Sequence, residues 1–242
     1  MRLPSTEAML DAWERGAPKG PVERGVILAA LAAPDATEDK LAALPIGQRD
    51  HYLLALRAAA FGPRLTGLLA CEACGEELEL DVAVDELRAA GSSAAAELTV
   101  AAGDYVVWLR LPDSHDLIAA AAASPEDGPG VLLHRCVVRA EQDGVPITAD
   151  ALPAELVTQA GNTLSDADPL ADLRFALTCI RCGHDCQTSF DTATFLWTEL
   201  DAWAGRIHRE IHTLASAYGW SERDILRLGP ARRARYLRMI EA

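Results

Sequence analysis

Four cysteines, arranged as two copies of a Cys-x-x-Cys-Gly segment, are the residues of this sequence best suited to bind a metal ion. In each copy an apolar residue and one spacer precede the first cysteine, as in Leu69 to Gly75 and again in Leu177 to Gly183. Such a turn puts two thiolates on one side of an ion, and Zn²⁺ prefers four soft ligands in a tetrahedron. The two copies therefore predict one structural zinc site formed by Cys71, Cys74, Cys179 and Cys182.

The interval between the two pairs is long, with 104 residues separating Cys74 from Cys179. Closing a longer loop costs only logarithmically more entropy, so the interval is compatible with one shared ion. Two alternatives stay open: the pairs are separate reduced thiols, or one of them is a redox pair. Cys186 and His184 adjoin the second pair and are substitute ligands. Cys136 lies in an apolar run and is predicted to be a small buried side chain.

The other candidates for chemistry are weaker, and the sequence does not predict an enzyme. Four thiolates leave no open position for water, so the predicted ion is structural. His208 and His212 are four residues apart but lack the glutamate that a zincin helix places directly after its first histidine. They are predicted to be helix-surface side chains. Ser114 and His115 are assigned to a helix start, because no G-x-S-x-G segment supports a nucleophile.

Helical patterns dominate the residues before the first cysteine pair. One predicted helix is capped by Ser5 or Thr6 and ends near Gly16, a second covers 22–33, and a third covers about 48–60. The third helix is predicted to end at Phe61-Gly62-Pro63, a Gly-Pro stop before the first cysteine pair.

Mixed signals fill the interval between the cysteine pairs. Apolar and acidic residues alternate over 78–82, which predicts a half-buried strand, and 97–111 has the pattern of a hairpin. A short helix is predicted over 116–123, and weak helix over 150–165. The apolar run 131–140 fits a strand or a helix, and its periodicity does not decide between them.

The clearest periodic signal follows the second cysteine pair. Apolar residues recur at spacings of three and four from Leu196 to Tyr218, which predicts one helix of about 25 residues ending at Gly219. Ser221 is placed to cap a short helix after it, and a basic helix is predicted over 231–240.

Together these elements predict an α+β fold with a zinc-ribbon core made by the two distant Cys-x-x-Cys segments, N-terminal helices and a long C-terminal amphipathic helix. The predicted organisation is a helical region at 1–64, ribbon halves at 65–84 and 171–191, an α/β insertion at 85–170 and a C-terminal helical region at 192–242.

Composition is that of a globular protein: of 242 residues, half are hydrophobic and 24% are charged. The formal net charge of −14 opposes binding to nucleic acid phosphates and to anionic membranes, so neither is an expected partner. No apolar segment near the start is long enough for a targeting or membrane-spanning segment. A cytoplasmic location is therefore expected, where cysteines stay reduced or bind metals.

Charge is unevenly distributed along the chain. Residues 201–242 hold eight arginines and five acidic residues, whereas the remainder is strongly acidic. We predict that this end docks on an acidic protein surface or on the acidic part of its own chain. Packing in the chain's own core is the alternative for the tryptophans. The predicted partner-binding residues are Trp197, Trp203, Trp220, Arg232 and Arg233.

Several stretches together resemble one known family. They are Gly47–Arg57 with Phe61-Gly62 before the first cysteine pair, Asp168–Asp172 before the second, then Phe190-Asp191, Phe195–Leu200, Ala217–Glu222 and Arg232–Leu237. This pattern resembles zinc-knuckle baseplate proteins and baseplate hub assembly chaperones of contractile phage tails and phage-tail-like contractile injection systems. The resemblance covers most of 40–82 and 168–240.

The resemblance implies a non-enzymatic role in the baseplate, with hub, spike, wedge or tube proteins as partners, the long helix as the partner-binding element and the four cysteines as zinc ligands. It leaves open whether the protein acts only during assembly or is incorporated into the particle. Two alternatives remain: a zinc-ribbon regulatory module that binds nucleic acid or transcription machinery through the arginine-rich C-terminus, and a metal-dependent enzyme that uses His208 and His212.

Overall fold

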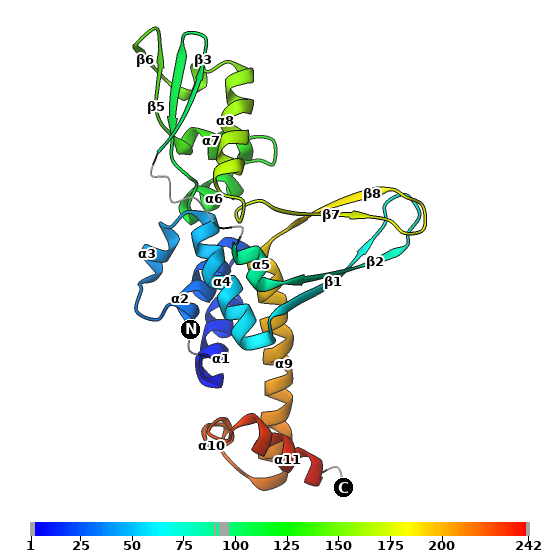
Figure 1. Cartoon of the computed structure of the whole chain (residues 1–242). Helices are drawn as coiled ribbons and strands as arrows, with labels where there is room; N and C mark the ends of the chain where they lie inside the picture. The colour runs from blue at the N-terminus through cyan, green and yellow to red at the C-terminus, as the bar shows by residue number, and fades with distance from the viewer. Residues whose placement is uncertain (1–2, 90, 92–96, 241–242) are drawn as a thin grey trace.

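The computed structural model describes residues 3–89, 91 and 97–240, and positions 90 and 92–96 of the predicted insertion lie outside the described residues. Figure 1 shows a central helical body from which two pairs of strands project to one side. A small sheet with its own helices lies at one end, and the C-terminal helices lie at the other. The chain is thus a mixed helix and sheet protein.

The helical body is built from both ends of the chain. It contains α1 (Thr6–Gly16), α2 (Pro21–Ala32), α3 (Glu38–Ala42), α4 (Ile46–Phe61) and α9 (Thr192–Tyr218). The Ser5 hydroxyl caps α1 by accepting from the backbone N–H of Ala8. Apolar side chains of α1, α2, α4 and α9 share one core, which includes Met9, Leu28, Ala29, Leu53, Leu56, Leu196 and Leu200. Burial of this shared core joins segments more than 130 residues apart in the sequence.

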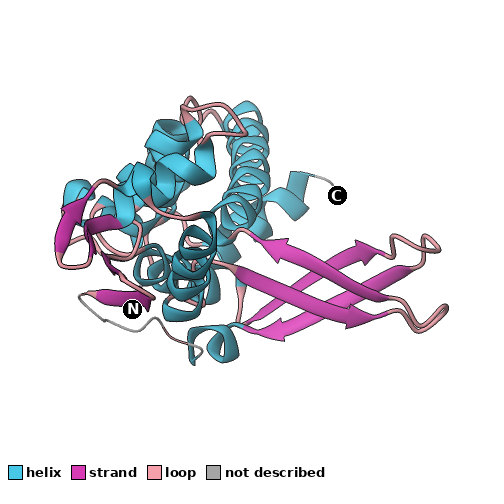
Figure 2. Cartoon of the chain, turned by 90° about the horizontal axis from the view of Figure 1, so that it is seen from above, coloured by secondary structure: helices cyan, strands magenta, loops and turns pink. Residues whose placement is uncertain are grey.

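Two antiparallel hairpins form what we call the hairpin arm. The first pairs β1 (Arg64–Ala70) with β2 (Glu77–Ala83), and the second pairs β7 (Leu173–Thr178) with β8 (Asp185–Phe190). Each is a separate two-stranded sheet, and Figure 2 shows the two projecting together from the helices. The strand predicted over 78–82 is present as β2. The other three strands were not predicted: β1 and β8 alternate less regularly, and the alternation of Leu173, Phe175 and Leu177 in β7 was overlooked.

The segment between the hairpins contains an antiparallel sheet with strand order β3-β4-β5-β6. Its strands are β3 (Leu98–Ala102), β4 (Tyr105–Leu109), β5 (Val137–Gln142) and β6 (Val145–Ile147), so the predicted hairpin over 97–111 is confirmed. The run 131–140 is both helix and strand, because α7 (Gly128–Cys136) leads directly into β5. Helix α8 (Ala154–Ala167) packs its apolar face on the sheet. Two shorter helices, α5 (Val84–Ala89) and α6 (Ser114–Ala121), join this segment to the body.

Beyond the body, α9 continues to two short helices at the C-terminal end (Figure 1). Gly219 ends α9 in the left-handed conformation with φ of 66°, which glycine adopts without steric cost. Ser221 caps α10 (Glu222–Leu226), and α11 (Pro230–Ile240) follows. None of the described helices has the length and the apolar character needed to cross a membrane.

Candidate metal centre

Each Cys-x-x-Cys segment is the turn of one hairpin of the arm. In the first turn, the backbone N–H of Cys71 donates to the carbonyl of Glu76, and the N–H of Gly75 donates to the carbonyl of Cys71, both at 2.8 Å. The second turn repeats both bonds at the same length through Cys179, Gly183 and His184. The repeated sequence pattern therefore folds into a repeated backbone geometry.

The glycine that follows each pair has a defined conformational role. Gly75 and Gly183 have φ of 73° and 74°, in the left-handed region that residues with a Cβ rarely adopt. This conformation turns the backbone back beneath the two preceding cysteines, so both sulfur atoms of a pair face the same side.

The four predicted ligands lie together, with all their sulfur atoms within 4.8 Å of one another. Cys71 and Cys182 have a sulfur–sulfur distance of 3.7 Å, and so do Cys74 and Cys179. A tetrahedron with metal–sulfur bonds of about 2.3 Å has edges of about 3.8 Å. A disulfide would need about 2.0 Å, and all six cysteines are free. The donor set and its spacing therefore fit a tetrahedral metal ion, and each of these two close pairs joins the two hairpins.

The surroundings of the four sulfur atoms change from the inside of the arm to its tip. Cys71 and Cys179 are buried against Leu78, whereas Cys182 is exposed. Across the tip, the Arg181 guanidinium forms an ion pair of 3.2 Å with Glu76, which adds a polar link between the hairpins. An ion bound here would be shielded on the inner side and reachable by solvent at the tip.

Electrostatics also favour a cation among these thiols. Burial raises the pKa of Cys71, but hydrogen bonds from the backbone N–H groups of Cys74 and Ala73 outweigh it and bring the pKa to about 6. The backbone N–H of Glu76 lowers the pKa of Cys74, whereas burial and the neighbouring thiols raise it to about 12. Because each thiolate opposes ionisation of the next, four thiolates need a positive ion between them.

The substitute ligands are not part of this cluster. Cys186 is buried beside Cys71 and Cys179, and its thiol faces the carbonyl of His184 at 3.8 Å. In the part of the chain that the structure describes, the four cysteines are the sole group of three or more potential ligands close enough to share an ion. Cys136 is fully buried, as predicted.

The predicted partner-binding tryptophans of α9 pack against the N-terminal helices. Trp197 is 8% exposed, lies 4.5 Å below the Arg24 guanidinium and covers Gly16. Trp203 is half-buried and packs next to Leu10. Both side chains pack α9 against the N-terminal helices. Such internal packing was the alternative to partner binding for these tryptophans.

The remaining predicted partner residues lie at the C-terminal end. Trp220 is half-buried and stacks on Tyr218 with ring centroids 4.7 Å apart. Arg232 is exposed, whereas Arg233 is buried and forms an ion pair of 3.0 Å with Glu210. Burial assigns Arg233 to internal packing, and Arg232 faces solvent.

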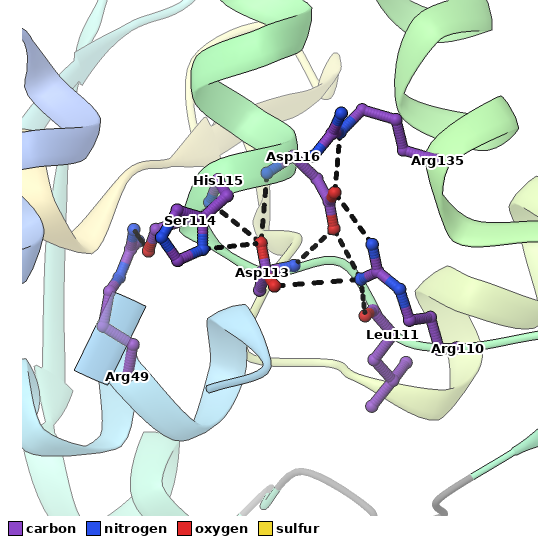
Figure 3. Close-up of polar contacts among 8 residues, drawn as sticks. All are labelled: Arg49, Arg110, Leu111, Asp113, Ser114, His115, Asp116 and Arg135. Carbon is purple, nitrogen blue, oxygen red and sulfur yellow. Dashed lines mark hydrogen bonds and ion pairs between the residues drawn. The ribbon is translucent and has the colours of Figure 1, made fainter. Parts of the chain in front are cut away.

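Neither histidine candidate belongs to a group of potential metal ligands among the described residues. His208 lies against the ring of Trp13, with centroids 5.2 Å apart, and His212 is exposed. Figure 3 shows Ser114 and His115 at the start of α6, where the Asp113 carboxylate accepts from the backbone N–H of His115 at 2.8 Å. The Ser114 hydroxyl is buried and accepts from Arg49 at 3.2 Å. This confirms that Ser114 and His115 belong to a helix start.

One buried polar cluster was missed by the sequence analysis. The carboxylate of Asp116 has no exposed surface and accepts from Arg110 at 2.6 and 2.9 Å, from Arg135 at 2.8 Å and from the N–H of Asp113 at 3.0 Å (Figure 3). Burial raises the pKa of Asp116, but these donors outweigh it and lower the pKa to about 2. The only local signal was an acidic residue in the first turn of a helix, which capping already explains.

A second buried pair lies beside this cluster. Asp50 accepts from the Arg49 guanidinium at 2.7 Å, and burial raises the pKa of Asp50 to about 6 although Arg49 opposes the shift. Arg49 connects α4 to the start of α6, so the two polar groups together join the body to the segment between the hairpins.

Comparison with known proteins gives one family. The family described as T4 bacteriophage base plate protein matches residues 27–197. No curated protein and no solved structure matches the chain. The matched residues include both hairpins with their four cysteines and stop near the start of α9, before the basic C-terminal helices.

Proposed function

The chain belongs to the T4 bacteriophage base plate protein family, and from this premise we propose that it is a non-enzymatic structural or assembly protein of the baseplate of a contractile phage-tail-like particle. The family match carries this proposal, because it spans most of the chain and both cysteine turns. Four thiolate ligands would fill a tetrahedral coordination sphere and leave no position for a substrate, which supports a structural role for the metal.

The metal we assign is Zn²⁺, held by Cys71, Cys74, Cys179 and Cys182. Four thiolates in a tetrahedron suit zinc, and iron is the other metal that uses this set. Zinc has no redox chemistry and fits a role in which the ion joins the two hairpins. Elemental analysis of the purified chain separates the two metals, with one zinc per chain expected and one iron per chain contradicting the assignment.

In this proposal the regions have different tasks. The two ribbon halves, 65–84 and 171–191, form one zinc-linked arm, and the segment 85–170 is an insertion between them. The N-terminal helices at 1–64 and the region 192–242 form the body and the partner-binding end. Other baseplate proteins, such as those of the hub, spike, wedge or tube, are the proposed partners.

The test is association with baseplate proteins in cells that make the particle. A tagged chain is purified gently, and its partners are identified by mass spectrometry. Sedimentation of whole particles then distinguishes a component, which sediments with them, from a chaperone, which stays in the light fractions. Purification of the free chain alone, or with partners unrelated to the tail, contradicts the proposal.

A further inference from the structure

Arginines at the C-terminal end differ from those in the rest of the protein. Of the eleven described arginines before residue 200, nine form ion pairs with carboxylates, and Arg24 and Arg139 lie over tryptophan rings. Among the eight in 201–240, Arg233 alone forms an ion pair within the described residues. The other seven are exposed: Arg206, Arg209, Arg223, Arg227, Arg232, Arg235 and Arg238.

Three of these exposed cations belong to one helix. Arg232, Arg235 and Arg238 recur every third residue along α11, so they follow one side of it for about 9 Å at a rise of about 1.5 Å per residue. A chain with a net charge of −14 thus places at one end a cluster of positive charge that pairs with no carboxylate of the described residues. Exposed cations that lack an ion pair in the described part of the chain favour a negatively charged surface that approaches from outside.

An apolar surface adjoins these cations. Met239 is 61% exposed, and Ile240 lies one helical turn after Tyr236 on α11. The Tyr236 ring in turn meets the Trp220 ring edge-on at a centroid distance of 5.0 Å. We call these residues, together with the three arginines of α11, the C-terminal patch. Protein interfaces combine such aromatic, methionine and arginine side chains.

Internal contacts hold the C-terminal patch in place. The buried Arg233 guanidinium donates to Glu210 of α9 and, at 2.7 Å, to the carbonyl of Leu228. Ile225 of α10 is fully buried, and Leu226 packs on the cluster formed by Leu10 and Ile207. A patch fixed in this way loses little conformational entropy when a partner binds.

From these observations we infer that the C-terminal patch binds an acidic segment of another protein, which pairs its carboxylates with Arg232, Arg235 and Arg238 and covers Met239. This inference rests on the proposed baseplate function and deepens it by naming the contacting surface and the chemistry of the partner.

A protein partner fits the patch better than a nucleic acid does. The aromatic rings of Tyr218, Trp220 and Tyr236 pack against one another and form no row of open faces on which bases could stack. The acidic remainder of the chain would also repel a long polyanion. A short acidic segment meets only the basic end.

The test is photo-crosslinking in cells that make the particle, with benzoylphenylalanine introduced in place of Met239 in the full chain. We expect a cross-link to an acidic peptide of one protein, identified by mass spectrometry. The double variant Arg235→Glu/Arg238→Glu should reduce the cross-link at least tenfold. Lys19→Glu/Lys40→Glu changes the net charge equally at exposed positions elsewhere and should leave it unchanged.

Once the acidic peptide is known, charge reversal in the partner gives a second criterion. Lysines in place of its acidic residues should weaken binding to the wild-type chain and restore it to the Arg235→Glu/Arg238→Glu variant. The inference is overturned by a cross-link that resists the double variant, by a neutral or basic peptide, or by no cross-link. Binding of duplex DNA or phosphatidylserine vesicles that depends on the same arginines, without an acidic protein, also overturns it.

The two proposals fail in different ways. If the chain co-purifies with baseplate proteins but contacts them elsewhere, only the assignment of the C-terminal patch as a binding surface is overturned. An acidic partner unrelated to a contractile tail would contradict the baseplate function and leave the assignment of the patch intact.

Discussion

The thiols of the metal centre share one geometry but differ in exposure. Cys71 and Cys179 are closed in by the hairpins, and Cys182 faces solvent at the tip. A reagent that attacks thiols or removes metal therefore reaches the cluster first at Cys182. Once that ligand is lost, three sulfur atoms remain to bind the ion, and they hold it more weakly.

Replacement of Cys179 by serine should release the metal and destabilise the arm. Even loss of an outer-shell partner lowers metal affinity by about 10–100-fold, so loss of a ligand should exceed that range. Cys136→Ala is the matched control, because Cys136 is equally buried and lies outside the cluster. Metal content per chain decides: if Cys179→Ser retains one equivalent, or if Cys136→Ala loses it, the assignment is wrong.

Asp116 provides a prediction about pH. Its pKa is depressed to about 2 in the folded protein, so its contribution to stability is present above the unfolded pKa of about 3.9 and is lost as pH falls towards 2. A shift of this size corresponds to about 2 kcal/mol. Asp116→Asn should therefore unfold more easily than the wild type at pH 7.

The measurement is urea unfolding of the wild type and Asp116→Asn at several pH values. The difference in unfolding free energy between them should shrink as pH falls from about 4 to about 2, because the wild-type carboxylate becomes protonated. A difference that stays constant over this range would show that Asp116 contributes by shape alone.

At the scale of single elements, two glycines in helices have opposite roles. The N–H of Gly47 in α4 donates to the Asp168 carboxylate at 2.8 Å, and a Cβ on Gly47 would lie 1.8 Å from the other carboxylate oxygen. Gly161 in α8 is exposed, and a Cβ there would contact nothing within 4 Å beyond its chain neighbours and the backbone of its own helix. The first glycine permits a close approach between α4 and the segment before β7.

Alanine at these two positions should therefore change stability in opposite directions. Gly47→Ala should cost about 2 kcal/mol or more, because the buried carboxylate has to move. Gly161→Ala should stabilise by about 0.5–1 kcal/mol, since alanine favours a helix over glycine. Thermal and urea unfolding of both variants tests this pair, and a neutral Gly47→Ala would contradict the close approach.

At the scale of the whole molecule, the proposed zinc ion would join hairpins that are far apart in the sequence. The base of the arm has its own apolar contacts, because Leu54, Leu65, Leu170 and Leu173 pack together there. At the tip, the hairpins are linked by the cysteines with a few leucines beside them and by the Arg181–Glu76 ion pair. Structure at the tip should therefore depend on the ion much more than structure at the base.

Removal of the metal with a chelator should loosen the tip and leave the helical body folded. Hydrogen exchange followed by mass spectrometry should show faster exchange in 68–79 and 176–187, and unchanged exchange in α2 and α4. Readdition of Zn²⁺ should restore protection. Faster exchange throughout the body would mean that the metal stabilises the whole fold. Unchanged exchange at the tip would mean that the metal does not stabilise the arm.

Local patterns in the sequence were sufficient wherever neighbouring residues decide the conformation. The two Cys-x-x-Cys-Gly turns, the helix caps at Ser5 and Ser221 and the hairpin over 97–111 follow from such patterns, since turns, caps and periodicity depend on residues a few positions apart. The family resemblance also rested on short stretches of this kind.

Tertiary structure alone decided the features that join distant residues. Cys71 and Cys182 are 111 positions apart, and only packing of the hairpins brings their sulfur atoms to 3.7 Å. Burial of Trp197 and the donors around Asp116 likewise come from separate elements. The same holds for charge, because composition predicts a basic C-terminal end but not which arginines pair with carboxylates. Burial and pairing depend on what the rest of the chain places nearby, and no local pattern contains that information.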